Sequence, residues 1–238
     1  MQFEITRDDL LKPLQSIIGV VERRQTLPVL ANVLLEKTDE RLALTATDLE
    51  VELRAEIDLA GGQPGRLTVP ARKLMDIVRN LPEDARVNLA MEQERVLVTA
   101  GRSRFTLAPL PAEDFPVTDA IEAAQTVALP QSDLRWIVEK THFAMALQDV
   151  RYYLNGLLFE MAPQKLRAVA TDGHRLALAA LSPDLQIDTP TQVIIPRKGV
   201  QEMLRLLAES DDTVSVTLGS SHVQVVLPDI RFTSKLID

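Results

Sequence analysis

Short apolar runs that lead into amphipathic stretches recur four times along this chain. The runs have the length of strands, and the apolar positions after them are three or four residues apart, as on one face of a helix. The predicted strands cover residues 3–6, 67–70, 127–130 and 193–196. The predicted buried helix positions are Leu10, Leu14, Ile17 and Val21; Leu74, Ile77, Val78 and Leu81; Leu134, Ile137, Val138 and Thr141; and Val200, Met203, Leu204 and Leu207.

The segments between these helices alternate apolar and polar residues, as strands with one buried face do. They include residues 41–47, 86–90, 95–100, 165–170 and 213–218. Asp172-Gly173 stands between two such runs and predicts a hairpin. Thr6 and Asp9 have the spacing of a helix capping box. The pattern predicts an α+β fold, with antiparallel strands and two helices per domain on one face.

Motifs that return at long range indicate a duplicated domain. Ala-Thr-Asp occurs at residues 46–48 and 170–172, and Arg-Phe-Thr occurs at residues 104–106 and 231–233. Asn32 matches Asn155 at an offset of 123 residues, and Phe105 matches Phe232 at an offset of 127. This slow drift is what loop insertions would produce. We predict two tandem copies, residues 1–118 and 119–238, joined through the polar, proline-containing stretch 111–125.

Composition narrows the class of protein. Hydrophobic residues make up 46% and charged residues 25% of the chain, which is typical of a globular protein. The absence of cysteine excludes disulfides and thiolate metal sites and agrees with a reducing cytoplasm. The N-terminus lacks a signal-peptide pattern, and no apolar run approaches the roughly 20 residues that span a bilayer. We expect a cytoplasmic protein with no membrane partner.

The net charge of −8 argues against a nucleic-acid ligand only if the basic residues are scattered, because a ligand feels the local field. Many basic residues fall on or near the four predicted helices, so a basic face on an acidic protein is one interpretation. An ordinary solvated face is the other, and acidic residues on the same helices favour it. The basic residues are Lys12, Arg23, Arg24, Arg72, Lys73, Arg79, Arg135, Lys140, Arg197, Lys198 and Arg205.

Signals of catalysis are weak. The three histidines, His142, His174 and His222, form no metal-ligand spacing. Asp172 and His174 resemble part of a dyad, but no nucleophile motif accompanies them. Residues 100–103 lack the spacing of a phosphate-binding loop. We therefore predict a protein that is not an enzyme, with no cofactor, no metal and no catalytic residue.

Seven segments resemble the bacterial DNA polymerase III beta subunits, the sliding clamps. They are residues 11–14 (LKPL), 26–30 (TLPVL), 69–73 (VPARK), 148–156 (QDVRYYLNG), 170–176 (ATDGHRL), 196–199 (PRKG) and 231–235 (RFTSK). The resemblance implies that each subunit has three clamp domains. Two such subunits would close head to tail into a ring around duplex DNA. Helices would line the hole and antiparallel sheets would form the outside. The chain ends where this family continues into a third domain, so we expect the fragment alone to be monomeric and to bind DNA weakly.

The resemblance also implies a DNA-contact set. Arg24, Gln148, Tyr152 and Tyr153 match positions that touch DNA in the family, and Arg72, Arg197 and Lys198 are further candidates. Arginine meets phosphate, glutamine bonds to backbone oxygens, and tyrosine can stack on a base. Without the resemblance, packing of the two tyrosines against a sheet is the favoured alternative.

Two protein-binding sites are implied in the same way. The first is a pocket for a short peptide of polymerase, clamp loader or other clamp-motif proteins, matched here by Leu154, Thr171, Gly173, His174, Arg175 and Leu176. A plain β-turn with a solvated histidine remains the alternative. The second is the homodimer interface, matched by Lys73, Arg104, Phe105 and Leu107. The alternative is an edge strand that basic residues guard against aggregation.

Taken with the resemblance, the residues predict a DNA sliding clamp that tethers the replicative polymerase. A sequence-independent, peptide-binding scaffold without a DNA role is the alternative function. The two differ in one feature, which is whether the basic and tyrosine positions meet DNA.

Overall fold

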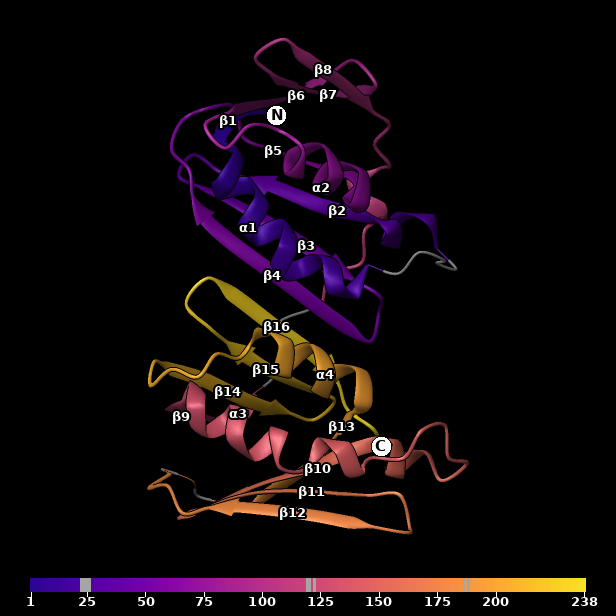
Figure 1. The fold of residues 1–238 in the computed structure, drawn as a ribbon, viewed down its shortest axis with the longest axis vertical. Helices are drawn as coiled ribbons and strands as arrows, with labels where there is room; N and C mark the ends of the chain where they lie inside the picture. Colours follow the sequence, from indigo (N-terminus) through magenta and orange to yellow (C-terminus); the bar gives the residue numbers. More distant parts are fainter. Residues whose placement is uncertain (22–26, 119–120, 122, 186, 188) are drawn as a thin grey trace. The chain divides into compact units, whose positions relative to one another are not determined.

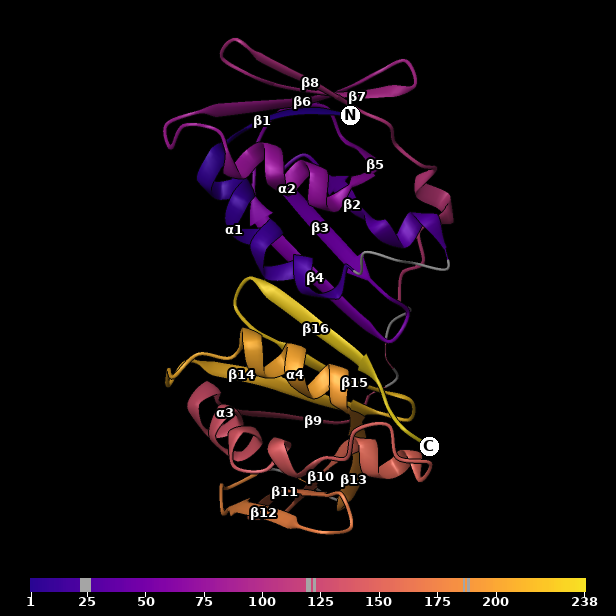
Figure 2. The same cartoon turned by 45° about the vertical axis from the view of Figure 1, so that its right-hand side comes forward.

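The computed structural model describes residues 1–21, 27–118, 121, 123–185, 187 and 189–238. The chain divides into two compact units, Met1–Val117 and Thr118–Asp238. Figures 1 and 2 show that the elements of each unit follow the same plan. Each unit is described below by itself.

Four copies of a strand–helix–three strands module make up the chain, as the apolar pattern predicted. Unit 1 contains β1 (Gln2–Thr6), α1 (Arg7–Ile17), β2 (Asn32–Lys37), β3 (Arg41–Thr47), β4 (Val51–Asp58), β5 (Gly65–Pro70), α2 (Ala71–Arg79), β6 (Arg86–Glu92), β7 (Arg95–Ala100) and β8 (Ser103–Leu107). Unit 2 contains β9 (Ala123–Pro130), α3 (Gln131–Glu139), β10 (Gly156–Ala162), β11 (Lys165–Thr171), β12 (Leu176–Leu181), β13 (Thr191–Pro196), α4 (Arg197–Leu206), β14 (Thr213–Gly219), β15 (His222–Val226) and β16 (Ile230–Lys235). Short 3-10 helices are η1 (Ile18–Val20), η2 (Pro28–Ala31), η3 (Ala112–Asp114), η4 (His142–Ala144) and η5 (Tyr152–Asn155).

The two modules of a unit exchange their first strands. In unit 1 the strand orders are β1-β6-β7-β8 and β5-β2-β3-β4, and in unit 2 they are β9-β14-β15-β16 and β13-β10-β11-β12. All of these pairings are antiparallel, for example Phe3↔Leu89 in unit 1 and Val127↔Val216 in unit 2. Each sheet therefore needs both modules, and neither module can close its sheet alone.

The two helices of each unit lie side by side and cover one face of its sheets (Figures 1 and 2). In unit 1, α1 contacts β3 and β4, while α2 contacts β2 and β5. Leu10, Leu14 and Ile17 of α1 are fully buried, which confirms the helical face predicted from their spacing. In unit 2, Leu134 and Ile137 are buried in the same way. Burial of such side chains contributes about 1.5–3 kcal/mol each, so this face stabilises both units.

Thr6 caps α1 as predicted. Its Oγ1 accepts a hydrogen bond from the Asp9 backbone N–H at 3.2 Å and donates to Asp9 Oδ2 at 2.6 Å. The cap satisfies one of the N–H groups that a helix start leaves without a partner. Asp9 also lies in the first turn, where its negative charge is favourable.

A polar pair is buried between β2 and β5. Asn32 Nδ2 donates to Thr68 Oγ1 at 2.9 Å, and both side chains are almost wholly inaccessible. Thr68 Oγ1 in turn donates to the Leu110 carbonyl at 2.7 Å and accepts from the Leu110 N–H at 3.0 Å. Thr68 thus ties the β5-β2-β3-β4 sheet to the segment that leaves it, and Asn32 supports Thr68 from the neighbouring strand.

Candidate functional site

The loop between η4 and β10 of unit 2 carries three of the predicted DNA-contact residues. Gln148 is exposed in the loop, and Tyr152 and Tyr153 form the first turn of η5. The tyrosine side chains are 60% and 49% exposed, and their rings meet edge to face with centroids 6.2 Å apart. The alternative that these tyrosines are packed against the sheet is therefore wrong. Their contact with DNA stays a prediction.

An ion pair stiffens the same loop. Both carboxylate oxygens of Asp149 accept from the Arg151 guanidinium, at 3.0 and 2.9 Å, and Oδ1 also accepts from the Arg151 N–H at 2.8 Å. These hydrogen bonds to Arg151 lower the pKa of Asp149 to about 2. The Asp149 carboxylate is therefore ionised at any pH at which DNA would bind.

The predicted hairpin is present between β11 and β12. Asp172 Oδ1 accepts from the backbone N–H groups of His174 at 2.9 Å and Arg175 at 3.0 Å, and these bonds lower the pKa of Asp172. Gly173 has a φ of +88°, a backbone conformation that a residue with a Cβ rarely adopts. The turn runs through four residues, Asp172 to Arg175, between Thr171 at the end of β11 and Leu176 at the start of β12.

The structure brings this hairpin against the tyrosine-bearing loop. Arg175 Nη2 donates to the Phe143 carbonyl at 2.7 Å, and its guanidinium lies 5.7 Å from the centre of the Phe143 ring. A Cβ added to Gly173 would lie 3.2 Å from Arg151 Nη2. Leu154, at the end of the loop, accepts a backbone hydrogen bond from Ala146 at 2.9 Å. The predicted peptide-binding residues and three predicted DNA-contact residues therefore occupy one region of unit 2.

Two of the further DNA-contact candidates, Arg197 and Arg72, donate hydrogen bonds within the fold. Arg197, at the start of α4, donates from Nη1 to the Met145 carbonyl at 3.1 Å. Arg72, in the first turn of α2, donates from Nη2 to the Val21 carbonyl. Lys198 is partly exposed beside Arg197. Arg24, which matches a DNA-contact position of the family, lies outside the described residues.

The predicted assembly residues lie on unit 1. Phe105 and Leu107 belong to β8, which is the edge strand of its sheet within the unit, and Lys73 is exposed on α2. Phe105 pairs with Val98 and so points to the core side of the sheet, whereas Arg104 points to the opposite side.

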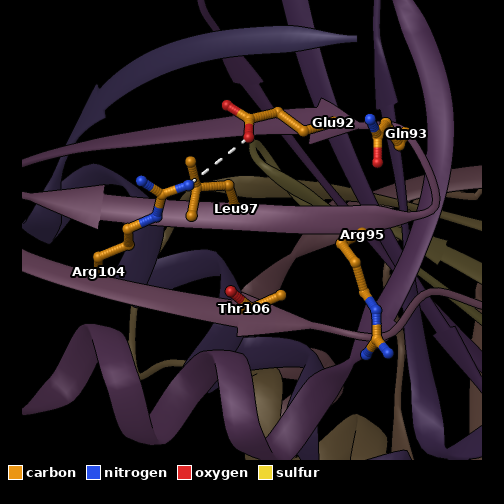
Figure 3. A pocket seen from close by; sticks show the side chains of 6 residues that line it. All are labelled: Glu92, Gln93, Arg95, Leu97, Arg104 and Thr106. Atoms are coloured by element: carbon orange, nitrogen blue, oxygen red, sulfur yellow. Dashed lines mark ion pairs between the residues drawn. The ribbon is translucent and has the colours of Figure 1, made fainter.

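A hollow of about 590 Å³ lies on the Arg104 side of this sheet. Glu92, Gln93, Arg95, Leu97, Arg104 and Thr106 line it, and Figure 3 shows Arg104 and Glu92 directed toward one another. Their charged atoms are 3.7 Å apart. The pair is exposed, so it contributes little to stability and leaves both charges accessible.

The described part of the chain holds no group of three carboxylate or imidazole side chains that could bind a metal ion.

Two family models match the chain. The family model for the DNA polymerase III beta subunit, N-terminal domain, matches residues 1–119, and the model for its central domain matches residues 128–238. The chain belongs to the DNA polymerase III beta subunit family.

Relatives in this family match the whole chain. A beta sliding clamp of Pseudomonas putida is 53% identical over 239 residues, and one of Escherichia coli is 48% identical. The crystal structure of the DNA polymerase III subunit beta from Pseudomonas aeruginosa superposes with a TM-score of 0.97 at 51% identity, covering 100% of this chain and 65% of that one. The chain spans 65% of the length of the two curated relatives as well. The helices that the structure describes include none long and apolar enough to cross a membrane.

Two residues that shape the loop between η4 and β10 were not predicted from the sequence. Arg151 and Asn155 stand inside a segment that we singled out, but neither was assigned a role. An Asp-x-Arg spacing at residues 149–151 is a signal for a local ion pair, and an asparagine that follows a loop signals bonds to nearby backbone. Both signals were present in the sequence.

Proposed function

We propose that this chain is part of a DNA sliding clamp, a non-enzymatic ring that encloses duplex DNA and keeps the replicative polymerase on it. The observation that carries the proposal is the family match across both units. The exposed Tyr152 and Tyr153 and the neighbouring Gln148 support it, because they offer a surface that meets DNA without reading its sequence. Enclosure rather than affinity holds the DNA, which suits a chain with a net charge of −8.

The partners follow from the same proposal. The peptide-binding pocket takes polymerase, clamp-loader and other clamp-motif segments at Leu154, Thr171, Gly173, His174, Arg175 and Leu176. Leu176 is exposed at the start of β12 and supplies apolar surface for such a peptide. Lys73, Arg104, Phe105 and Leu107 contribute to the homodimer contact that closes the ring. The protein acts in the bacterial cytoplasm.

The test is retention on circular DNA. The full-length protein is loaded by its clamp loader onto nicked circular DNA, in wild-type form and as Arg24→Ala/Tyr152→Ala/Tyr153→Ala. We expect the wild type to remain on the circle at high salt and to leave once the circle is cut. Survival after cutting, or failure to load, would overturn the proposal.

The triple variant separates two stages, the loading of the protein onto DNA and its retention there. Loss of loading with normal retention assigns the three residues to loading, while equal loading and retention means that enclosure alone suffices.

A peptide-binding scaffold without a DNA role is the second candidate. The exposed side chains of Leu176 and Leu178 on β12 favour a protein-binding surface by themselves. A wild type that binds clamp-motif peptides but is never retained on circular DNA would establish this function in place of the clamp.

A further inference from the structure

One side chain joins the middle of loop 145–155 to its end. Asn155 Oδ1 accepts from the Asp149 backbone N–H at 2.9 Å, and Asn155 Nδ2 donates to the Asp149 carbonyl at 2.9 Å. The amide thus satisfies both backbone groups of one residue, as a neighbouring strand would do. Asp149 has no strand partner, because it lies between η4 and η5. Asn155 supplies the pairing that the loop lacks.

The residue next to Asp149 has a backbone conformation that needs such support. Gln148 has a φ of +54°, in the left-handed region that L-residues other than glycine rarely adopt. A conformation of this kind persists only where the surrounding structure enforces it. The two hydrogen bonds of Asn155 fix the peptide groups on both sides of Asp149, and therefore fix the direction in which Gln148 projects.

The tyrosines depend on the same residue. Tyr152 and Tyr153 lie in η5, which ends at Asn155, and about half of each side chain is exposed. Because the rings pack edge to face against each other and about half of each side chain is exposed, the backbone of η5 sets the direction of the pair. The loop is also closed at its base, where the Ala146 N–H donates to the Leu154 carbonyl.

We propose that Asn155 is a positioning residue that fixes loop 145–155 in the one conformation in which Gln148, Tyr152 and Tyr153 meet DNA. The inference rests on the proposed DNA role of this loop. It assigns Asn155 no contact with DNA.

Arg197 anchors the other end of the loop. Its hydrogen bond to the Met145 carbonyl holds the residue that directly follows η4. Unit 1 repeats this arrangement, since Arg72 donates to the carbonyl of Val21, the residue that directly follows η1. In both units the arginine stands in the first turn of the second helix. Recurrence in both units indicates that the bond belongs to the fold, so Arg197 shares the positioning role.

The chain allows a direct test, because Tyr152 and Tyr153 are its only tyrosines. In the 238-residue chain labelled with 3-fluorotyrosine, every ¹⁹F NMR signal comes from this loop. We expect two separate signals in the wild type and a shift of both toward the position of the unfolded chain in Asn155→Ala. Unchanged signals in Asn155→Ala would overturn the proposal.

Binding to a fluorescent primed DNA at low salt supplies the second readout. Asn155→Ala should weaken binding about 5- to 10-fold, as expected for the loss of two hydrogen bonds that hold the loop. The slope of log K against log salt should stay as in the wild type, because no charge is removed. Arg197→Ala should behave likewise if Arg197 positions the loop. A slope smaller by about 0.9 with unmoved ¹⁹F signals would instead make Arg197 a phosphate contact.

Three further variants separate the possible failures. Asn80→Ala removes an asparagine whose Nδ2 bonds to a backbone carbonyl, that of Asp76, and should change neither readout. Asn155→Asp keeps an acceptor for the Asp149 N–H but replaces the donor with a carboxylate oxygen that faces the Asp149 carbonyl, so its signals should also move away from those of the wild type even if the alanine variant folds poorly. If Gln148→Ala/Tyr152→Ala/Tyr153→Ala binds DNA as the wild type does, the DNA role of the loop fails, while the ¹⁹F signals of Asn155→Ala still decide whether Asn155 positions it.

Discussion

The two units share every α-helix and strand, yet the asparagines beside their corresponding strands β2 and β10 serve opposite purposes. Asn32 of unit 1 is buried between β2 and β5 and joins Thr68 inside the sheet. In unit 2 the position that corresponds to Asn32 is Gly156, which pairs with Pro196 as Asn32 pairs with Pro70. The preceding residue, Asn155, ties Asp149 of an exposed loop. In unit 1 the amide stabilises the fold, whereas in unit 2 it shapes a surface. A duplicated domain can therefore keep its architecture while one copy has an asparagine inside the sheet and the other has it one position earlier, beside a surface loop.

The edge strands show the same divergence. Arg-Phe-Thr stands in β8 of unit 1 and in β16 of unit 2, but Phe105 is 37% exposed and Phe232 is fully buried. Ser234 of β16, two residues after Phe232, approaches Gly199 of α4 so closely that an added Cβ would lie 2.4 Å from its Oγ. The helix in unit 2 thus covers β16 closely. Phe105 has less cover and leaves apolar surface at the edge of its sheet.

The largest expected difference between the units lies at these phenylalanines. Phe232→Ala should lower the free energy of unfolding by about 3–5 kcal/mol, because it leaves a cavity in a packed core. Phe105→Ala should cost about 1 kcal/mol, since part of its surface is already in water. Urea unfolding of the 238-residue chain measures both. Equal losses would mean that the two strands are not differently covered.

The asparagine pair should show a smaller difference in the same measurement. Asn32→Ala should cost about 1–2 kcal/mol, because it removes a buried hydrogen bond while Thr68 keeps its bonds to Leu110. Asn155→Ala should cost less than about 1 kcal/mol in global stability, since the loop opens locally before the unit unfolds. Amide hydrogen exchange should nevertheless rise across residues 145–155 in that variant and stay unchanged in Asn32→Ala.

The sequence was sufficient to predict the strand–helix modules, but it did not predict how the strands of two modules pair into sheets. Apolar spacing predicted the helices that bury Leu10 and Leu134, and the Asp172-Gly173 pair predicted the β11–β12 hairpin. The exchange of β1 and β5 between sheets could not be predicted, because local pattern does not determine which strands pair over long separations. The role of Asn155 was hidden for a related reason. An asparagine beside a strand has the same local pattern whether its amide turns inward, as Asn32 does, or outward.

The Asp149–Arg151 ion pair predicts that the stability of the loop between η4 and β10 depends on pH. The folded pKa of Asp149, about 2, lies below its ordinary value of 3.8, so the pair stabilises the loop fully above that value and loses its contribution as pH falls toward 2. The carboxyl ¹³C signal of Asp149 should stay in its ionised position at pH 3. In Arg151→Ala the midpoint should rise toward 3.8 but stay below it, because the N–H of residue 151 still donates to Oδ1, and a midpoint unchanged from the wild type would show that the guanidinium is not the cause.

The smallest effect on stability is expected at the edge of unit 1, where it separates folding from assembly. Arg104 and Glu92 are 68% and 57% exposed, so Arg104→Ala should change the free energy of unfolding by less than about 0.5 kcal/mol. If β8 is a subunit contact, the same variant in the full-length protein should weaken self-association, which sedimentation velocity over a concentration series measures. Arg41→Ala is the matched control, because Arg41 is 64% exposed and pairs with Glu56 on β4 of the same unit. An equal loss of self-association in both variants would indicate a general effect of charge. A loss in Arg104→Ala alone would support β8, with its exposed Phe105, as the subunit contact.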